Sequence, residues 1–115
     1  MKLPNAEQAV VAREKLTDYL LNPGHRYGAS KARFFAEFGF CIERWEELAE
    51  ALREQGRMHE VAQVRETGFG PRYAVDGALN TPVERRPRVR SVWQMDEGAI
   101  APRLITAYPL LEMTL

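Results

Sequence analysis

The chain has 115 residues, so a single domain over residues 1–115 is expected, and its 45% hydrophobic content is enough for one apolar core. The 16 basic and 16 acidic residues cancel, so net charge alone points to no class of partner. Because Cys41 is the only cysteine, an internal disulfide and a cysteine-based metal site are both excluded. No signal peptide or membrane-spanning apolar run is visible, which predicts a cytoplasmic protein with no membrane partner.

Helical spacing of apolar residues predicts three helices in the first half of the chain. They are expected over residues 13–21, 31–38 and 43–55. Ser30 has the side chain of a good N-cap for the second helix, and Gly56 suits the C-cap of the third.

From residue 58 the period changes from helical to alternating, which predicts strands. Four strands are expected, over residues 58–66, 72–79, 88–95 and 103–109. Short turns join these runs, so antiparallel pairing is natural. The predicted fold class is therefore α+β, with N-terminal helices packed on a four-stranded antiparallel sheet. The helices can cover only one sheet face, which leaves the other partly open.

The same periodicities predict the core. The positions expected to face inward are Leu16, Tyr19, Leu20, Phe34, Phe35, Phe38, Trp45, Leu48, Leu52, Val75 and Val92. Burial of Trp45 would make its replacement by alanine cost about 3–5 kcal/mol.

Known signatures exclude several classes of enzyme. The chain has no phosphate loop, no dinucleotide fingerprint and no HExxH motif. His25 and His59 lie far apart without ligand spacing, so neither a metal site nor a cofactor is expected. Thirteen of the 16 basic residues are Arg, whose planar fork suits phosphate and carboxylate, although a G- and C-rich genome would give the same bias.

Basic and hydroxyl side chains gather in three segments of the sequence. The clusters are His25, Arg26, Lys31 and Arg33; Arg85, Arg86, Arg88 and Arg90; and Arg103, Thr106 and Tyr108. Cations at the start of a helix face the positive end of the backbone dipole, so the first cluster suggests a nearby anion. Strict strand alternation places Arg103 on the face opposite Thr106 and Tyr108, and a bulge after Pro102 would change this.

Cleavage of RNA without a metal needs a base for the ribose 2′-hydroxyl, an acid for the leaving 5′-oxygen, and cations beside the phosphate. Histidine, lysine, arginine, tyrosine and threonine side chains can fill these roles. The sequence therefore predicts that His25, Lys31 and at least one of Arg103, Thr106 and Tyr108 line a common pocket.

Three segments also carry a resemblance to known proteins: "KLTDYLLNPGHRYGASKARFF", "GPRYAVDGAL" and "VRSVWQMDEGAIAPRLITAYP". In order and spacing they resemble a family of small uncharacterised bacterial proteins whose domain also occurs at the C-termini of polymorphic, contact-dependent toxins. Such domains look like the barnase, EndoU, colicin and RelE group of ribonucleases. That group has N-terminal helices on a four-stranded antiparallel sheet.

The resemblance implies a metal-independent, toxin-related ribonuclease with RNA, either tRNA or rRNA, as substrate. It implies a cognate immunity protein or antitoxin as a second partner. His25 and Lys31 match the "NP-H-G-KA" segment of the toxin relatives, and Arg103 and Thr106 match their "PRL-T" segment. Toxin relatives follow delivery domains, and this sequence contains none.

The roles expected at such a site are specific. His25 would act as general base or acid, Lys31 and Arg103 would clamp the phosphate, and Thr106 and Tyr108 would position the substrate. Two other functions stay open: a non-enzymatic interaction module, antitoxin-like or phage-associated, that uses the open sheet face, and a nucleic-acid binder without catalysis. An interaction module needs a flat exposed patch, typically apolar and aromatic, whereas a nuclease needs a cleft.

Overall fold

Three helices form from the first half of the chain, in the places that apolar spacing predicts. The computed structural model describes residues 1–110. α1, Arg13–Lys15, continues into a wider π-helical turn over Leu16–Leu20; α2 covers Ala29–Glu37 and α3 covers Trp45–Met58. Short 3-10 turns lie at Ala6–Gln8 and Ile42–Arg44.

The alternating second half forms four strands in one antiparallel sheet. β1 is Val61–Thr67, β2 is Gly70–Ala78, β3 is Arg88–Gln94 and β4 is Arg103–Pro109. Their order in the sheet is the order in the sequence. The predicted α+β fold with a four-stranded antiparallel sheet is therefore confirmed.

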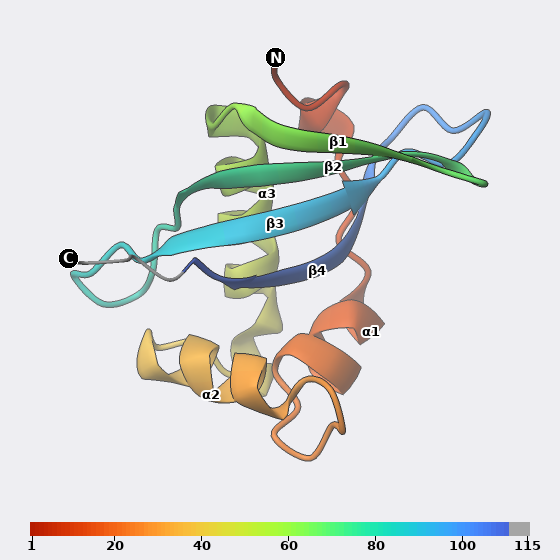
Figure 1. The fold of residues 1–115 in the computed structure, drawn as a ribbon. Helices are drawn as coiled ribbons and strands as arrows, with labels where there is room; N and C mark the ends of the chain where they lie inside the picture. Colours follow the sequence, from red (N-terminus) through yellow and green to blue (C-terminus); the bar gives the residue numbers. More distant parts are fainter. Residues whose placement is uncertain (111–115) are drawn as a thin grey trace, which may run out of the picture.

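The helices lie on one side of the sheet (Figure 1). In this view α3 crosses behind β2 and β3, while α1 and α2 lie below the sheet, beside β4. No helix covers the opposite face, within the part of the chain that the structure describes. Across residues 1–110, no helix combines the length and apolar character needed to traverse a bilayer.

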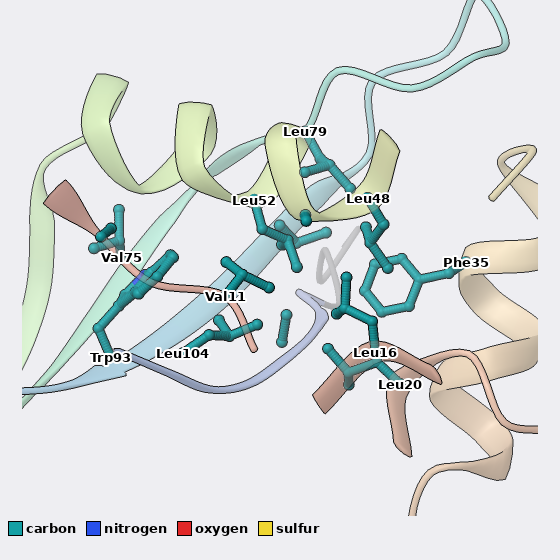
Figure 2. Packing of buried hydrophobic residues seen from close by; sticks show 14 of the residues in the cluster. Val11, Leu16, Leu20, Phe35, Leu48, Leu52, Val75, Leu79, Trp93 and Leu104 are labelled. Atoms are coloured by element: carbon teal, nitrogen blue, oxygen red, sulfur yellow. The ribbon is translucent and has the colours of Figure 1, made fainter. Parts of the chain in front are cut away.

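The core lies between the helices and the inner face of the sheet (Figure 2). Leu16, Leu20, Phe35, Phe38, Leu48, Leu52 and Val75 are buried there, as predicted. Tyr19, Phe34 and Trp45 are partly buried against the same cluster.

Two expectations for the core need correction. Val92 lies on the open face, because its neighbour Trp93 points inward and is fully buried. Trp45 is only half-buried at the start of α3, where the guanidinium carbon of Arg13 lies 6.0 Å from its ring centroid. Trp93 therefore takes the central place expected of Trp45.

A buried polar chain ties α3 to the middle of the sheet. The Gln55 amide nitrogen donates to the carbonyls of Val75, at 3.0 Å, and Val89, at 3.1 Å. Its amide oxygen accepts from the Ser91 hydroxyl at 2.5 Å, and that hydroxyl accepts from the Trp93 indole nitrogen at 2.8 Å. Each buried polar group thus has a partner, which buried groups require.

The two predicted helix caps are wrong, each for its own reason. α2 begins at Ala29, so Ser30 lies inside its first turn, and the His25 ring binds the backbone N–H of Gly28 before it. Gly56 lies inside α3, where an added Cβ would come within 2.9 Å of the Trp93 ring. Gly56 therefore permits close packing of α3 on Trp93 rather than ending the helix.

A bulge in β4 decides which side chains reach the open face. Val92 pairs with Thr106 while Trp93 pairs with Leu104, so Ile105 is an extra residue between them. Leu104 and the Ala107 methyl point into the core. Arg103 consequently shares the open face with Thr106, and the strict-alternation prediction for Arg103 is wrong.

Candidate functional site

A hollow of about 220 Å³ lies on the open face and spans all four strands. We call it the arginine trough. Its polar lining is Gln63, Arg65, Arg72, Arg90, Thr106 and Tyr108, and its apolar lining is Ala74, Val92 and Ile105. Three guanidinium groups and two hydroxyls thus surround one concave surface.

The strand register places two of these arginines directly opposite each other. Arg65 on β1 pairs with Arg72 on β2. Like charges at directly opposed positions destabilise a sheet. Within residues 1–110 neither guanidinium takes part in an ion pair. A bound anion would relieve this repulsion, and the guanidinium fork matches the oxygens of a phosphate.

Arg90 is fixed at the other side of the trough by Asp76, its cross-strand partner on β2. Its Nε and Nη2 donate to the two carboxylate oxygens at 2.7 Å and 2.9 Å. The hydrogen bond to Asp76 raises the pKa of Arg90 above its ordinary value, against the effect of burial, and the Tyr108 hydroxyl beside it adds to the rise. Asp76 therefore fixes the position of the Arg90 guanidinium, and Tyr108 is the cross-strand neighbour of Arg90 on β4.

Arg72 is oriented by a buried glutamine. Its Nε donates to the Gln94 amide oxygen at 3.0 Å, and the Gln94 amide nitrogen donates to the Gly70 carbonyl at 3.0 Å. Gln94 is only 1% exposed. A neutral amide holds Arg72, and its positive charge acts on the Asp96 carboxylate, whose pKa it helps to lower.

His25 lies in the loop between α1 and α2, where it organises the backbone. Its Nδ1 accepts hydrogen bonds from the N–H groups of Tyr27 and Gly28, each at 3.0 Å. Nδ1 is therefore unprotonated, and the ring proton of neutral His25 lies on Nε2. In this arrangement Nδ1 of His25 holds the backbone of the loop in place.

Tyr19 connects that loop to the sheet. The π-helical turn, closed by a bond of 2.8 Å from the Leu21 N–H to the Leu16 carbonyl, carries Tyr19 toward β4. Its hydroxyl lies 3.0 Å from the Thr106 hydroxyl, and its ring centroid lies 5.0 Å from that of His25.

The structure distributes four of the five predicted site residues over two further hollows rather than one. His25 and Thr106 line a hollow of about 450 Å³ together with Tyr19. Lys31 and Tyr108 line another, of about 370 Å³. Thr106 and Tyr108 also line the arginine trough, so β4 is the element that all three hollows share.

Lys31 is held away from any carboxylate within the described residues. Its Nζ donates to the Tyr27 carbonyl at 3.3 Å and lies 5.5 Å from the centroid of the Tyr19 ring. The Lys15 ammonium lies at the same distance from that ring. Lys31 and His25 therefore contact one aromatic ring, although they line different hollows.

Arg103 is occupied by an ion pair. Its Nε and Nη2 donate to the Asp96 carboxylate at 2.7 Å and 3.3 Å. It is absent from the lining of the trough and of the two further hollows. The hydrogen bond from Arg103 lowers the pKa of Asp96 below its ordinary value of 3.8.

This pair gives a pH-dependent prediction. Because the folded-state pKa of Asp96 is lowered, its stabilisation is present above the unfolded pKa and is lost as pH falls through the folded one. We expect Arg103→Gln to lower the urea midpoint slightly at pH 7, since both partners are well exposed. The difference between the variant and parent midpoints should shrink as pH falls below 3.8, the ordinary pKa of the aspartate carboxyl. A difference that does not shrink with falling pH would show that Arg103 stabilises the fold by another contact.

Sequence reasoning missed half of the trough. The missed residues are Gln63, Arg65 and Arg72, from β1 and β2. The sequence pattern marks them only as alternating strand residues. Of the cluster at residues 85–90, only Arg90 reaches the trough, while the Arg85 guanidinium lies 4.6 Å from the centroid of the Phe38 ring. The available signal was an arginine in each of three predicted strands, at Arg65, Arg72 and Arg90.

Comparison with known proteins places the chain in a family. A family model described as a domain of unknown function, DUF6883, matches residues 2–111. The chain belongs to the DUF6883 family. The match spans the helices, the sheet and the arginine trough, so the trough is part of the family domain. No curated protein and no solved structure matches the sequence.

A group of three histidine, cysteine, aspartate or glutamate side chains suited to a metal is not found among residues 1–110 of this DUF6883 domain. The polar side chains of the trough are cations, hydroxyls and an amide. Such a set suits an anionic ligand, because its members present N–H and O–H donors.

Proposed function

We propose that this DUF6883 protein is a metal-independent ribonuclease-like domain that binds the RNA backbone in the arginine trough. The carrying observation is the opposed pair Arg65 and Arg72, two cations that form no ion pair among residues 1–110 and lie at one end of a concave surface. The resemblance to toxin-associated ribonucleases supports the same class of substrate. RNA is the substrate class, and a cytoplasmic site of action is part of the proposal.

In this proposal the cations of the trough stabilise the negative charge that builds on the phosphate oxygens in the transition state. The ribose 2′-oxygen attacks the adjacent phosphorus, the bond to the 5′-oxygen breaks, and the products carry a 2′,3′-cyclic phosphate and a 5′-hydroxyl. Solvent water takes the proton of the 2′-hydroxyl. In this scheme the Tyr108 hydroxyl, beside the Arg90 guanidinium, donates its proton to the 5′-oxygen and regains one from solvent, so the net transfer runs from the 2′-oxygen to the 5′-oxygen.

The other predicted residues have different roles in this scheme. The Thr106 hydroxyl orients the substrate at the β4 side of the trough. His25 offers Nε2–H as a hydrogen-bond donor, and Lys31 adds positive charge beside Tyr108. Arg103 lies outside the hollow, so the clamp role falls to Arg65 and Arg72 instead.

The direct test is cleavage of total RNA by purified protein in EDTA. We expect discrete fragments that carry 5′-hydroxyl ends. Tyr108→Phe should slow cleavage about 10²–10⁴-fold while leaving RNA binding and the melting temperature nearly unchanged. Arg57→Ala, which removes an exposed arginine from α3, is the matched control and should cleave like the parent.

Binding without cleavage is the second candidate, and one observation favours it. The Nδ1 of His25 is occupied by two backbone N–H groups, which removes the histidine from proton transfer. If the protein binds RNA in the trough and releases no fragments in the assay above, this second function holds. If RNA does not bind at all, both fail. An immunity protein or antitoxin that covers the same arginines through an acidic surface is then the remaining proposal for the open face.

A further inference from the structure

The loop between α1 and α2 presents an aromatic ring to solvent without a core role. The Tyr27 side chain is 67% exposed, whereas Tyr19 on the preceding turn is half-buried. Both the backbone N–H and the carbonyl of Tyr27 are bonded, to the His25 ring and to Lys31. The backbone under the exposed ring is therefore fixed, and Tyr27 belongs to an ordered surface.

This ring borders the hollow that contacts the end of the arginine trough. Tyr27, His25 and Tyr19 line one wall of the hollow, and Ile105 and Thr106 of β4 line the other. Ile105 and Thr106 also line the trough. The two hollows therefore meet at the β4 bulge, and a chain bound along the trough could place its next unit against the aromatic wall.

The charge around the aromatic wall is positive. The Arg26 guanidinium lies 5.4 Å from the centroid of the Tyr27 ring, and the Lys15 and Lys31 ammonium groups each lie 5.5 Å from that of Tyr19. Within residues 1–110 none of these three cations takes part in an ion pair. Aromatic rings flanked by cations are the surface on which unpaired nucleobases stack, because every base has a flat π-face.

We propose that Tyr27 is a stacking platform for one unpaired base, so that the substrate is single-stranded RNA rather than a duplex. The inference rests on the proposed function, since the arginine trough holds the phosphates and Tyr27 holds the base. A base already paired in a duplex is stacked on its neighbours and cannot lie on Tyr27 without being unpaired. The loop with Tyr27 therefore discriminates single-stranded RNA from a duplex, and the arginine trough binds the phosphates.

The test compares three ligands that do not depend on cleavage: a 2′-O-methyl-uridine decamer, a decamer with tetrahydrofuran in place of each base, and a 2′-O-methyl RNA duplex of ten base pairs. We expect the parent protein to bind the base-bearing decamer about tenfold more tightly than the abasic one. Tyr27→Ala should abolish this preference and leave abasic binding unchanged, while Tyr27→Phe should retain it. Phe69→Ala, which removes an exposed ring from the turn between β1 and β2, is the control.

The outcomes separate this inference from the proposed function. If Tyr27→Ala binds both decamers as the parent does, or if the parent prefers the duplex, the stacking platform is refuted while the trough stands. If Arg65→Gln with Arg72→Gln leaves binding unchanged but Tyr27→Ala weakens it, stacking stands and the trough is refuted. If the parent binds none of the ligands, both are refuted.

Discussion

Replacing Trp93 by alanine is expected to lower the free energy of unfolding by about 3–5 kcal/mol. The Trp93 side chain is fully buried between the sheet and α3. Gly56, the α3 residue against its ring, has no side chain that could fill the space. The change also removes the indole N–H that donates to Ser91, so the buried polar chain from Gln55 loses its end. A loss of this size removes much of the stability of an ordinary domain.

The measurement is urea unfolding followed by circular dichroism. Trp45→Ala is the matched control, because Trp45 is only half-buried and should cost distinctly less. Trp93→Phe, which keeps most of the buried area, should fall between them and guards against a Trp93→Ala variant that does not fold. Equal midpoints for the Trp93→Ala variant and the parent would contradict the described packing of β3 on α3.

Replacing both Arg65 and Arg72 by glutamine is expected to weaken binding of single-stranded RNA about 10- to 100-fold. Each lost phosphate contact should reduce the slope of log K against log salt by about 0.7. Arg65→Gln alone should leave the melting temperature level or raise it at low salt, because it removes one of two like charges that lie directly opposite each other. Arg72→Gln also removes the hydrogen bond to the buried Gln94 amide oxygen, so the double variant should melt somewhat below the parent. Fluorescence anisotropy with a labelled 2′-O-methyl-uridine decamer gives the affinity and the slope together.

Arg57→Gln provides the control for general charge, since it removes one exposed arginine from α3. For Arg57→Gln the slope of log K against log salt should equal that of the parent. If the double variant at β1 and β2 binds RNA like the parent, the arginine trough is not the RNA site. If Arg65→Gln melts well below the parent, Arg65 stabilises the fold rather than serves a ligand.

The fold was predictable because each half of the chain repeats one period. Helical spacing located the three helices, and alternation located the four strands to within a few residues. α3 runs to Met58, three residues beyond its predicted end, because Gly56 lies against Trp93 instead of capping the helix. Helix ends are decided by such tertiary contacts, and the local sequence does not report them.

The candidate site was predictable only in part. Thr106 and Tyr108 were expected to act together, and they do line the trough. The pairing of Arg65 with Arg72 is set by the two-residue turn between Thr67 and Gly70, which are themselves paired. The predicted strands end at residue 66 and begin again at residue 72, so this turn was not recognised and the two arginines were not expected to lie opposite each other.

The chemistry assigned to His25 shows a second limit of the sequence. A histidine in a glycine-rich loop was expected to exchange protons. In the structure its Nδ1 accepts from two backbone N–H groups and so shapes the loop. Whether a ring nitrogen is available depends on the turn that surrounds it, and residue type and spacing carry no such information.

The central claim is that RNA occupies the arginine trough, and an NMR titration tests it most directly. The arginine Nε–H signals of ¹⁵N-labelled protein should be followed as the 2′-O-methyl-uridine decamer is added. We expect the signals of Arg65 and Arg72 to shift in a saturable way, while that of Arg57 on α3 stays in place. Saturable shifts at Arg57, with Arg65 and Arg72 unmoved, would contradict the claim and place the ligand on the helical side of the molecule.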